Sequence, residues 1–290
     1  MPSADDGPVT AAQRWREQLE GWAIPAEILA AVPDSPWTQP TGVFGRRAEA
    51  ALANPSGLSY QRAREAVGEG GTVLDVGCGG GAASLPLRQP VTGVDTSERM
   101  LAELRHRAEQ AGVPVATIQG RWPDIADRAP IVDVVVCHHV AYNAPDLAEF
   151  AKALDQHARR RVVMELTASH PTAPLNPLWA AMHGLTRPTR PTADDAVAVL
   201  REAGLDAIRE SGPRPPRPEY HDIEDLIAVT RRRLCLTPDR DPELRAELLR
   251  LGVDPRHPRD LPGPDGDTVV TLWWDCGSPT PPSADRAARS

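Results

Sequence analysis

The stretch of this chain whose chemistry is easiest to interpret contains one acid followed by four glycines. The segment VLDVGCGGG, residues 73–81, places Asp75 in a short apolar run, with glycines at positions 77, 79, 80 and 81. Glycine allows a tight turn and lets backbone N–H groups approach a ligand without interference from a Cβ atom. The spacing D-x-G-x-G-x-G differs from the G-x-G-x-x-G of dinucleotide-binding turns. The segment therefore predicts a strand followed by a ligand-binding turn, the alternative being a tight turn that binds nothing.

Two motifs together resemble the class I S-adenosylmethionine-dependent methyltransferases. The first is this glycine turn, and the second is VTGVDTSERML at 91–101, with Asp95 at the end of the predicted second strand. The resemblance covers 70–170 well and 190–275 as sheet topology alone. It implies S-adenosylmethionine as cofactor, with Asp95 accepting hydrogen bonds from both ribose hydroxyls, as one carboxylate can. The cofactor contacts expected from the two motifs are Asp75, Gly77, Cys78, Gly79, Gly81, Asp95 and Thr96.

A third cofactor contact is expected in QGRWPD, residues 119–124. Many family members carry an acid directly after the equivalent of Gly120, whereas this chain has Arg121 and Trp122 there. The resemblance implies that the backbone N–H of Arg121 meets an adenine nitrogen. Trp122 either stacks on the adenine or only packs the loop, and both interpretations stay open.

Two histidines follow the most strand-like segment of the chain. His138 and His139 lie in CHHVAYN, residues 137–143, at the edge where ligands of open α/β sheets bind. The resemblance implies that both lie beside the methionine part of the cofactor. Either could act as a general base, because histidine titrates near neutral pH. Alternatively both only shape the pocket, since in-line methyl transfer can proceed by positioning alone.

The acceptor pocket is predicted from aromatic residues outside these motifs. They lie in the N-terminal region, beside the histidines and in a proline-rich insert at 167–191. Two of them, Trp179 and His183, are four residues apart and would share one face of a short helix. Plain packing of a small subdomain is the alternative for each tryptophan. The residues assigned to the pocket are Trp22, Trp37, Tyr142, Trp179 and His183; no metal site is expected, because no His or Cys spacing suits one.

Strands that alternate with helices must position these residues. The pattern predicts a Rossmann-like α/β fold with a doubly wound, mostly parallel seven-stranded sheet, an N-terminal helical cap and an insert after strand 5. Pro86 should limit the helix after the glycine turn to about two turns. The expected strands are 73–76, 91–94, 113–118, 131–137, 161–166, 205–210 and 269–273. The expected helices are two within 11–32 and others at 59–68, 97–111, 146–158, 192–203, 219–234 and 240–252, with a loop at 33–45.

The chain is expected to divide into three parts. Residues 1–60 form a tail and helical cap, 61–276 the S-adenosylmethionine-binding domain, and 277–290 a disordered tail. Within the middle part, 167–191 is a lid-like insert and 213–266 a helical insert.

Composition narrows the function classes. A formal charge of −8 argues against a nucleic-acid partner held by phosphate contacts. The N-terminus has no signal-peptide pattern, and no stretch is apolar enough to cross a bilayer, so a cytoplasmic protein is expected. The predicted activity is methyl transfer to a small-molecule acceptor. A tRNA or rRNA methyltransferase, a non-catalytic S-adenosylmethionine-binding protein and transfer of another group from the same donor are the alternatives. The sequence predicts neither the acceptor nor the oligomeric state.

Overall fold

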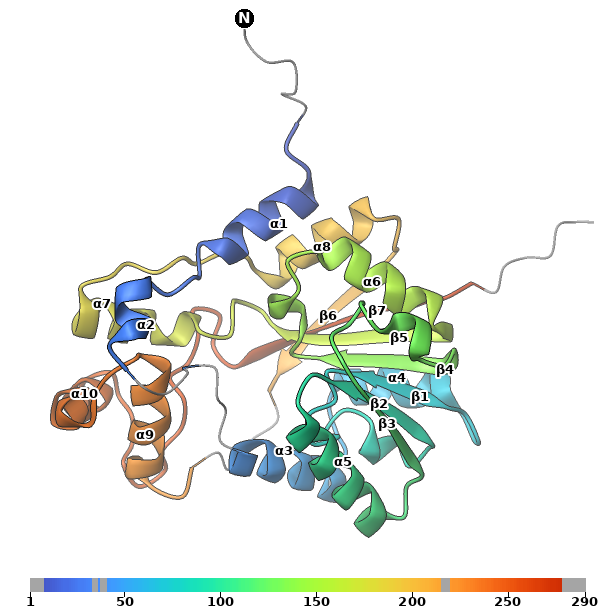
Figure 1. The fold of residues 1–290 in the computed structure, drawn as a ribbon, viewed down its shortest axis with the longest axis horizontal. Helices are drawn as coiled ribbons and strands as arrows, with labels where there is room; N and C mark the ends of the chain where they lie inside the picture. Colours follow the sequence, from blue (N-terminus) through green and yellow to red (C-terminus); the bar gives the residue numbers. More distant parts are fainter. Residues whose placement is uncertain (1–7, 33–35, 37–40, 215–219, 278–290) are drawn as a thin grey trace, which may run out of the picture.

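A seven-stranded sheet forms the centre of the computed structural model, which describes residues 8–32, 36, 41–214 and 220–277, without the side chains of 41–45 and 47 (Figure 1). The strand order is β3-β2-β1-β4-β5-β7-β6. The first five strands are parallel, and β7 runs antiparallel to both β5 and β6. The predicted Rossmann-like, mostly parallel sheet is therefore confirmed. The strands are β1 (Val73–Val76), β2 (Val91–Asp95), β3 (Val115–Gln119), β4 (Val132–His138), β5 (Ala158–Thr167), β6 (Ile208–Pro213) and β7 (Thr268–Asp275).

Helices cover both faces of this sheet. On one face lie α1 (Ala11–Glu20), α6 (Leu147–Gln156) and α8 (Ala193–Glu202) (Figure 1). On the other lie α3 (Thr41–Ala53), α4 (Leu58–Val67) and α5 (Glu98–Ala111). The spacing of the buried residues Leu147, Phe150 and Leu154 on α6 explains the packing, because positions three and four apart share one helix face. Both faces of the central strands β1 and β4 are thereby buried, which is why their sequences are so rich in valine.

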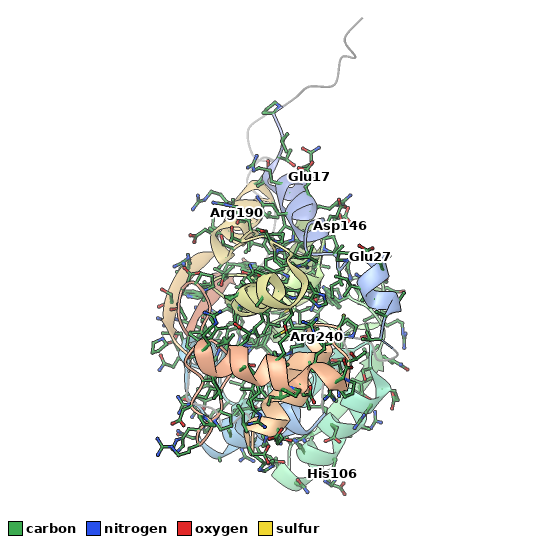
Figure 2. The ribbon with its side chains drawn as sticks, turned by 90° about the vertical axis from the view of Figure 1, so that its left-hand side faces the viewer. Glu17, Glu27, His106, Asp146, Arg190 and Arg240 are labelled. Atoms are coloured by element: carbon green, nitrogen blue, oxygen red, sulfur yellow. The ribbon has the colours of Figure 1, made fainter. Side chains whose placement is uncertain are left out.

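A second helical layer extends beyond the carboxyl ends of the strands. It consists of α7 (Asn176–His183), α9 (Ile223–Arg233) and α10 (Asp241–Arg250), which bury their own apolar core, with Ile28 of α2 (Ala26–Ala30) packed against it. Figure 2 shows the molecule from this side. Arg240, labelled there, donates to the carbonyl of Met182 at 3.0 Å and so ties the start of α10 to α7. The N-terminal region and the two predicted inserts therefore share contacts.

Two elements differ from the sequence-based expectation. The chain after the glycine turn forms only turns and the short 3-10 helix Leu85–Leu87, where a helix of about two turns was expected. Pro86 explains the difference, because it has no N–H to donate within a longer helix. Residues 41–45 were expected in a loop but begin α3. No helix among the described residues is long and apolar enough to span a membrane.

Candidate functional site

A cavity of about 860 Å³ opens at the carboxyl ends of β1, β2, β4 and β5. Its walls come from the glycine turn, the ends of β2 and β4, the loop after β3, and the adjoining parts of α3 and α4. Nearly all residues expected to bind the cofactor or act in catalysis meet there, although they come from four separate stretches of the chain. Those that line the cavity are Asp75, Gly77, Cys78, Gly79, Asp95, Thr96, Arg121, Trp122, His138 and His139.

The glycine turn depends on three left-handed residues, with φ of 72° at Gly77, 49° at Gly79 and 86° at Gly81. A Cβ atom on Gly77 would lie 2.3 Å from the side chain of Val140, so only glycine fits there. Gly79 has no atom within 4 Å of that position and faces open space. Gly81 packs against Leu104 and does not line the cavity, so its contribution is to the shape of the turn.

Asp95 lies at the rim of the turn and holds it in place. Its Oδ2 accepts a hydrogen bond from the backbone N–H of Gly79 at 3.0 Å, and its Oδ1 accepts from the N–H of Ser97 at 2.9 Å. The backbone N–H groups of Gly77 and Cys78 also donate to the carbonyl of Val94, at 2.8 and 3.0 Å. The turn and the end of β2 therefore form one rigid unit with a carboxylate at the cavity.

Asp75 is a buried acid with one oxygen still available. Its side chain is 1% exposed, and Oδ2 accepts a hydrogen bond from Ser84 Oγ at 2.6 Å. Oδ1 has no hydrogen-bond partner among the described residues, although Asp75 lines the cavity. Burial raises the pKa of Asp75 to about 7, and the nearby carboxylate of Asp95 adds to the effect. A buried acceptor of this kind is suited to a donor group on a bound ligand.

Trp122 forms an apolar wall of the cavity. It is 6% exposed, and its Nε1 donates to the carbonyl of Phe150 at 3.3 Å, while its ring meets His157 edge-on at 5.0 Å. Its orientation is thus set by the protein, and Phe150 lines the cavity beside it. Arg121 is exposed at the mouth.

His139 and Glu165 form the most constrained polar contact of the site. His139 is left-handed, with φ of 60°, which is uncommon for a residue other than glycine. Its backbone N–H donates to the carbonyl of Glu165 at 2.6 Å, and its Nε2 lies 3.2 Å from Glu165 Oε1. Ser59 Oγ donates to the other carboxylate oxygen at 2.5 Å.

The contacts of Glu165 favour its ionised form. Burial alone would raise the pKa of this 8% exposed acid. The hydrogen bond from His139, the charges of the two neighbouring imidazoles and the hydrogen bond from Ser59 outweigh burial and hold the pKa well below its usual range. Sequence reasoning missed Glu165, whose one available signal was an acid within the apolar strand RVVMEL. It also missed other cavity-lining residues: Asn54, Ser59, Tyr60, Met100 and Phe150.

The residues predicted for the acceptor pocket lie elsewhere. Trp22 stacks on His170 with ring centroids 3.9 Å apart and donates to a backbone carbonyl at 2.6 Å. The hydroxyl of Tyr142 donates to the carbonyl of Thr167 at 2.9 Å. Trp37 lies outside the described residues. The other four are at most partly exposed and do not line the cavity: Trp22, Tyr142, Trp179 and His183.

Trp179 and His183 do share a helix face, with ring centroids 4.8 Å apart. His183 Nε2 also lies 2.7 Å from the carbonyl of Leu234, which joins α7 to the end of α9. Both residues therefore contribute to the contacts of the second helical layer.

The donor set of the cavity fits S-adenosylmethionine. The left-handed Gly79 leaves room where a Cβ would stand, Asp95 offers a carboxylate for hydroxyl groups, and Asp75 Oδ1 awaits a donor. Trp122 supplies a flat apolar surface for a base ring.

Comparisons with known proteins agree with this geometry. The family described as "Methyltransferase domain" matches residues 73–161. Over 85 residues the chain is 41% identical to a ubiquinone biosynthesis O-methyltransferase from Paramagnetospirillum magneticum, covering 28% of this chain and 34% of that protein. Over 151 residues it is 32% identical to the protein of the same name from Pseudomonas aeruginosa, covering 47% of this chain and 65% of that protein.

A solved structure of a cyclopropane-fatty-acyl-phospholipid synthase-like protein from Lactobacillus casei aligns at a TM-score of 0.49 and 17% identity, over 90% of this chain and 99% of that one. The chain spans about a third to two-fifths of the length of the first curated relatives that it matches. The matched region holds the glycine turn, Asp95, Trp122 and both cavity histidines. Over residues 73–161 the chain is therefore similar to S-adenosylmethionine-dependent methyltransferases of class I.

Proposed function

We propose that this protein transfers the methyl group of S-adenosylmethionine to a small-molecule acceptor. The observation that carries the proposal is one continuous cavity that joins the glycine turn and Asp95 to His138 and His139. Donor and acceptor must meet in line for methyl transfer, and a shared cavity satisfies that requirement.

In this proposal each part of the cavity contacts a particular part of the donor or the acceptor. Asp95 accepts hydrogen bonds from the ribose hydroxyls, and Asp75 Oδ1 accepts from the amino group of the methionine part. Trp122 forms a wall for the adenine, with Arg121 and Thr96 at its edge. Cys78 and Gly79 provide the surface of the turn, while Gly81 maintains its shape. His138 and His139 are the candidates that face the acceptor.

The chemistry of the donor assigns the protein a limited task. When bound, S-adenosylmethionine supplies a methyl group already activated by the positive sulfur. The protein positions the acceptor atom and keeps water away from it. A cavity of about 860 Å³ lies in the usual range for small-molecule sites. The curated relatives carry names of O-methyltransferases of ubiquinone biosynthesis, which supports a small acceptor for this chain as well.

Calorimetric titration tests the proposal directly. S-adenosylmethionine and S-adenosylhomocysteine should bind to the wild type with micromolar affinity. Asp95→Ala should bind at least about 10-fold more weakly, because hydrogen bonds to charged groups contribute roughly 1.5–3 kcal/mol each.

Asp124→Ala provides the matched control. This acid lies on the same loop as Trp122, is exposed and does not line the cavity, so its removal should leave both affinities unchanged. Absence of binding to the wild type at millimolar ligand would overturn the proposal. If both substitutions weakened cofactor binding equally, the effect would come from the loss of negative charge in this region and not from the hydrogen bonds of Asp95.

A further inference from the structure

Glu165 restrains His139 at two points. The backbone N–H and the imidazole Nε2 of His139 both meet this one residue, at 2.6 Å to the carbonyl and 3.2 Å to the carboxylate. Ser59 Oγ, from α4, completes the arrangement by donating to the second carboxylate oxygen at 2.5 Å. Glu165 and Ser59 both lie outside the segment 73–161 that matches the methyltransferase family.

This contact determines which nitrogen of His139 can accept a proton. A carboxylate accepts hydrogen bonds and cannot donate them, so Nε2 must carry the hydrogen that faces Oε1. In the neutral imidazole the lone pair is then on Nδ1. The nearby carboxylate also stabilises the imidazolium that forms when Nδ1 takes a proton, which is the role of the acid in Ser-His-Asp triads.

Exposure distinguishes His139 from the preceding histidine. The His139 side chain is 34% exposed and lines the cavity, whereas Nε2 of His138 is buried. His138 pairs in the sheet with Glu165, and its imidazole also favours the ionised form of that carboxylate. Of the two candidates, His139 is the one whose partly exposed side chain lines the cavity and is also held by a carboxylate.

We propose that His139 is the general base of this enzyme, acting through Nδ1, with Glu165 and Ser59 as its positioning residues, and that the acceptor is a phenol-like hydroxyl. The inference rests on the proposed methyl transfer. A hydroxyl that keeps its proton at neutral pH needs a base, whereas an ionised acid or a free amine does not. The acceptor oxygen passes its proton to Nδ1 and bonds to the methyl carbon, while the carbon–sulfur bond breaks and sulfur keeps that electron pair.

Acceptor acidity provides the test in the full-length protein. We would assay wild type, His139→Asn, Glu165→Gln and Ser59→Ala with a series of substituted phenols, from alkylphenols to nitrophenols that are already ionised in neutral buffer. With alkylphenols, His139→Asn should lower kcat/KM by roughly 100-fold or more, and Glu165→Gln by roughly 10-fold or more. With nitrophenols both losses should shrink to a few-fold, because the proton has already left. Ser59→Ala should show the same dependence on the acceptor, with smaller losses of kcat/KM.

His106→Asn is the matched control, since His106, labelled in Figure 2, is exposed on α5 and does not line the cavity. It should leave every acceptor unchanged. Losses that are equal across the whole phenol series would overturn the base assignment and leave a structural role. Turnover of amines or thiols but of no phenol would overturn the acceptor class, and so would normal cofactor binding without turnover of any phenol.

Nitrogen NMR of the free, ¹⁵N-histidine-labelled protein gives a readout apart from activity. His139 should show the tautomer with hydrogen on Nε2, and Glu165→Leu should lose that preference while the His106 signals stay in place. A wild-type His139 with hydrogen on Nδ1 would overturn the assignment. Failure of the cofactor site itself would show separately, as loss of S-adenosylmethionine binding in the calorimetric titration.

Discussion

Asp95 accepts a hydrogen bond from the backbone N–H of Gly79 at 3.0 Å, across the cavity rim that separates β2 from the glycine turn. The two motifs that resemble those of methyltransferases are thus bonded to each other within the protein, without a ligand. Asp95 also accepts from Ser97 at the start of α5. One carboxylate therefore sets the shape of the turn and presents the remaining lone pairs to a ligand.

This double role predicts different effects for two substitutions of Asp95. Asn keeps an oxygen that can accept from Gly79 but loses the charge, so Asp95→Asn should weaken S-adenosylmethionine binding by about 10-fold. Asp95→Ala removes the acceptor as well and should weaken binding further, toward 100-fold. Calorimetry on both variants measures the difference. Identical affinities would show that the bond to Gly79 contributes nothing to the site.

Gly77 and Gly79 should respond differently to the same change. Gly77→Ala places a methyl group 2.3 Å from Val140 in a left-handed turn, so it should lower the free energy of unfolding by about 2–4 kcal/mol. Gly79→Ala meets no atom within 4 Å and should cost only about 1–2 kcal/mol, while its methyl group projects beside the cavity and weakens cofactor binding. Urea denaturation and calorimetry separate the two effects. A larger loss of stability in Gly79→Ala would contradict the geometry.

The sheet and the cavity wall formed by the glycine turn were predictable because their signals are local. Valine-rich runs such as the one in β4 specify buried parallel strands, and the glycine spacing specifies the turn that follows β1. The extra residues 158–160 of β5 were not predicted, since two arginines interrupt its apolar pattern. Prolines after the glycine turn were a local signal too, but they shortened the following helix more than expected.

The side of the cavity that holds His139 and Glu165 was less predictable, because its contacts depend on pairing across the sheet. Glu165 meets His139 only because β4 and β5 are neighbours in the register that pairs His138 with Glu165. Residue type alone suggested Trp22 and Trp179 for the pocket, yet both are buried in contacts away from the cavity. Large aromatic side chains serve cores and ligand sites equally well, so type cannot distinguish the two uses.

Asp75 should make stability fall as pH rises. Its folded-state pKa of about 7 lies above the ordinary value of 3.8, so between these two pH values the folded chain holds a proton that the unfolded chain has released. The cost of the buried charge is absent below about pH 4 and present in full above about pH 7. Asp75→Asn, which cannot ionise, should match the wild type near pH 4 and exceed its free energy of unfolding at pH 8 by on the order of 2–4 kcal/mol.

Urea denaturation at several pH values tests this, with Asp133→Asn as the opposite case. Burial disfavours the Asp133 charge, but hydrogen bonds from Thr72 outweigh burial and lower the pKa of that acid. Asp133→Asn should therefore reduce stability at neutral pH. If the free energy of unfolding of Asp75→Asn does not rise relative to the wild type between pH 4 and pH 8, then Asp75 is not a buried charge at neutral pH. The same variant should bind S-adenosylmethionine more weakly, because Oδ1 then faces the ligand without charge.

Arg187 should hold the N-terminal helices against the rest of the protein. Its guanidinium donates to the carbonyls of Trp22 and Ala23, the latter at 3.0 Å, and lies over the rings of Trp22 and Trp179 at 5.8 and 5.0 Å. Arg187→Met keeps an apolar stem but removes these contacts, so the free energy of unfolding should fall by about 1–3 kcal/mol. Limited proteolysis should then release the segment that precedes α3 earlier than in the wild type. Arg201→Met, on the exposed side of α8, is the control that should change neither measurement. Equal proteolysis rates in all three proteins would mean that other contacts hold these helices without Arg187, among them the buried hydrogen bond from Trp15 to the carbonyl of Ala144 and those from Ala11 and Ala12 to Glu202.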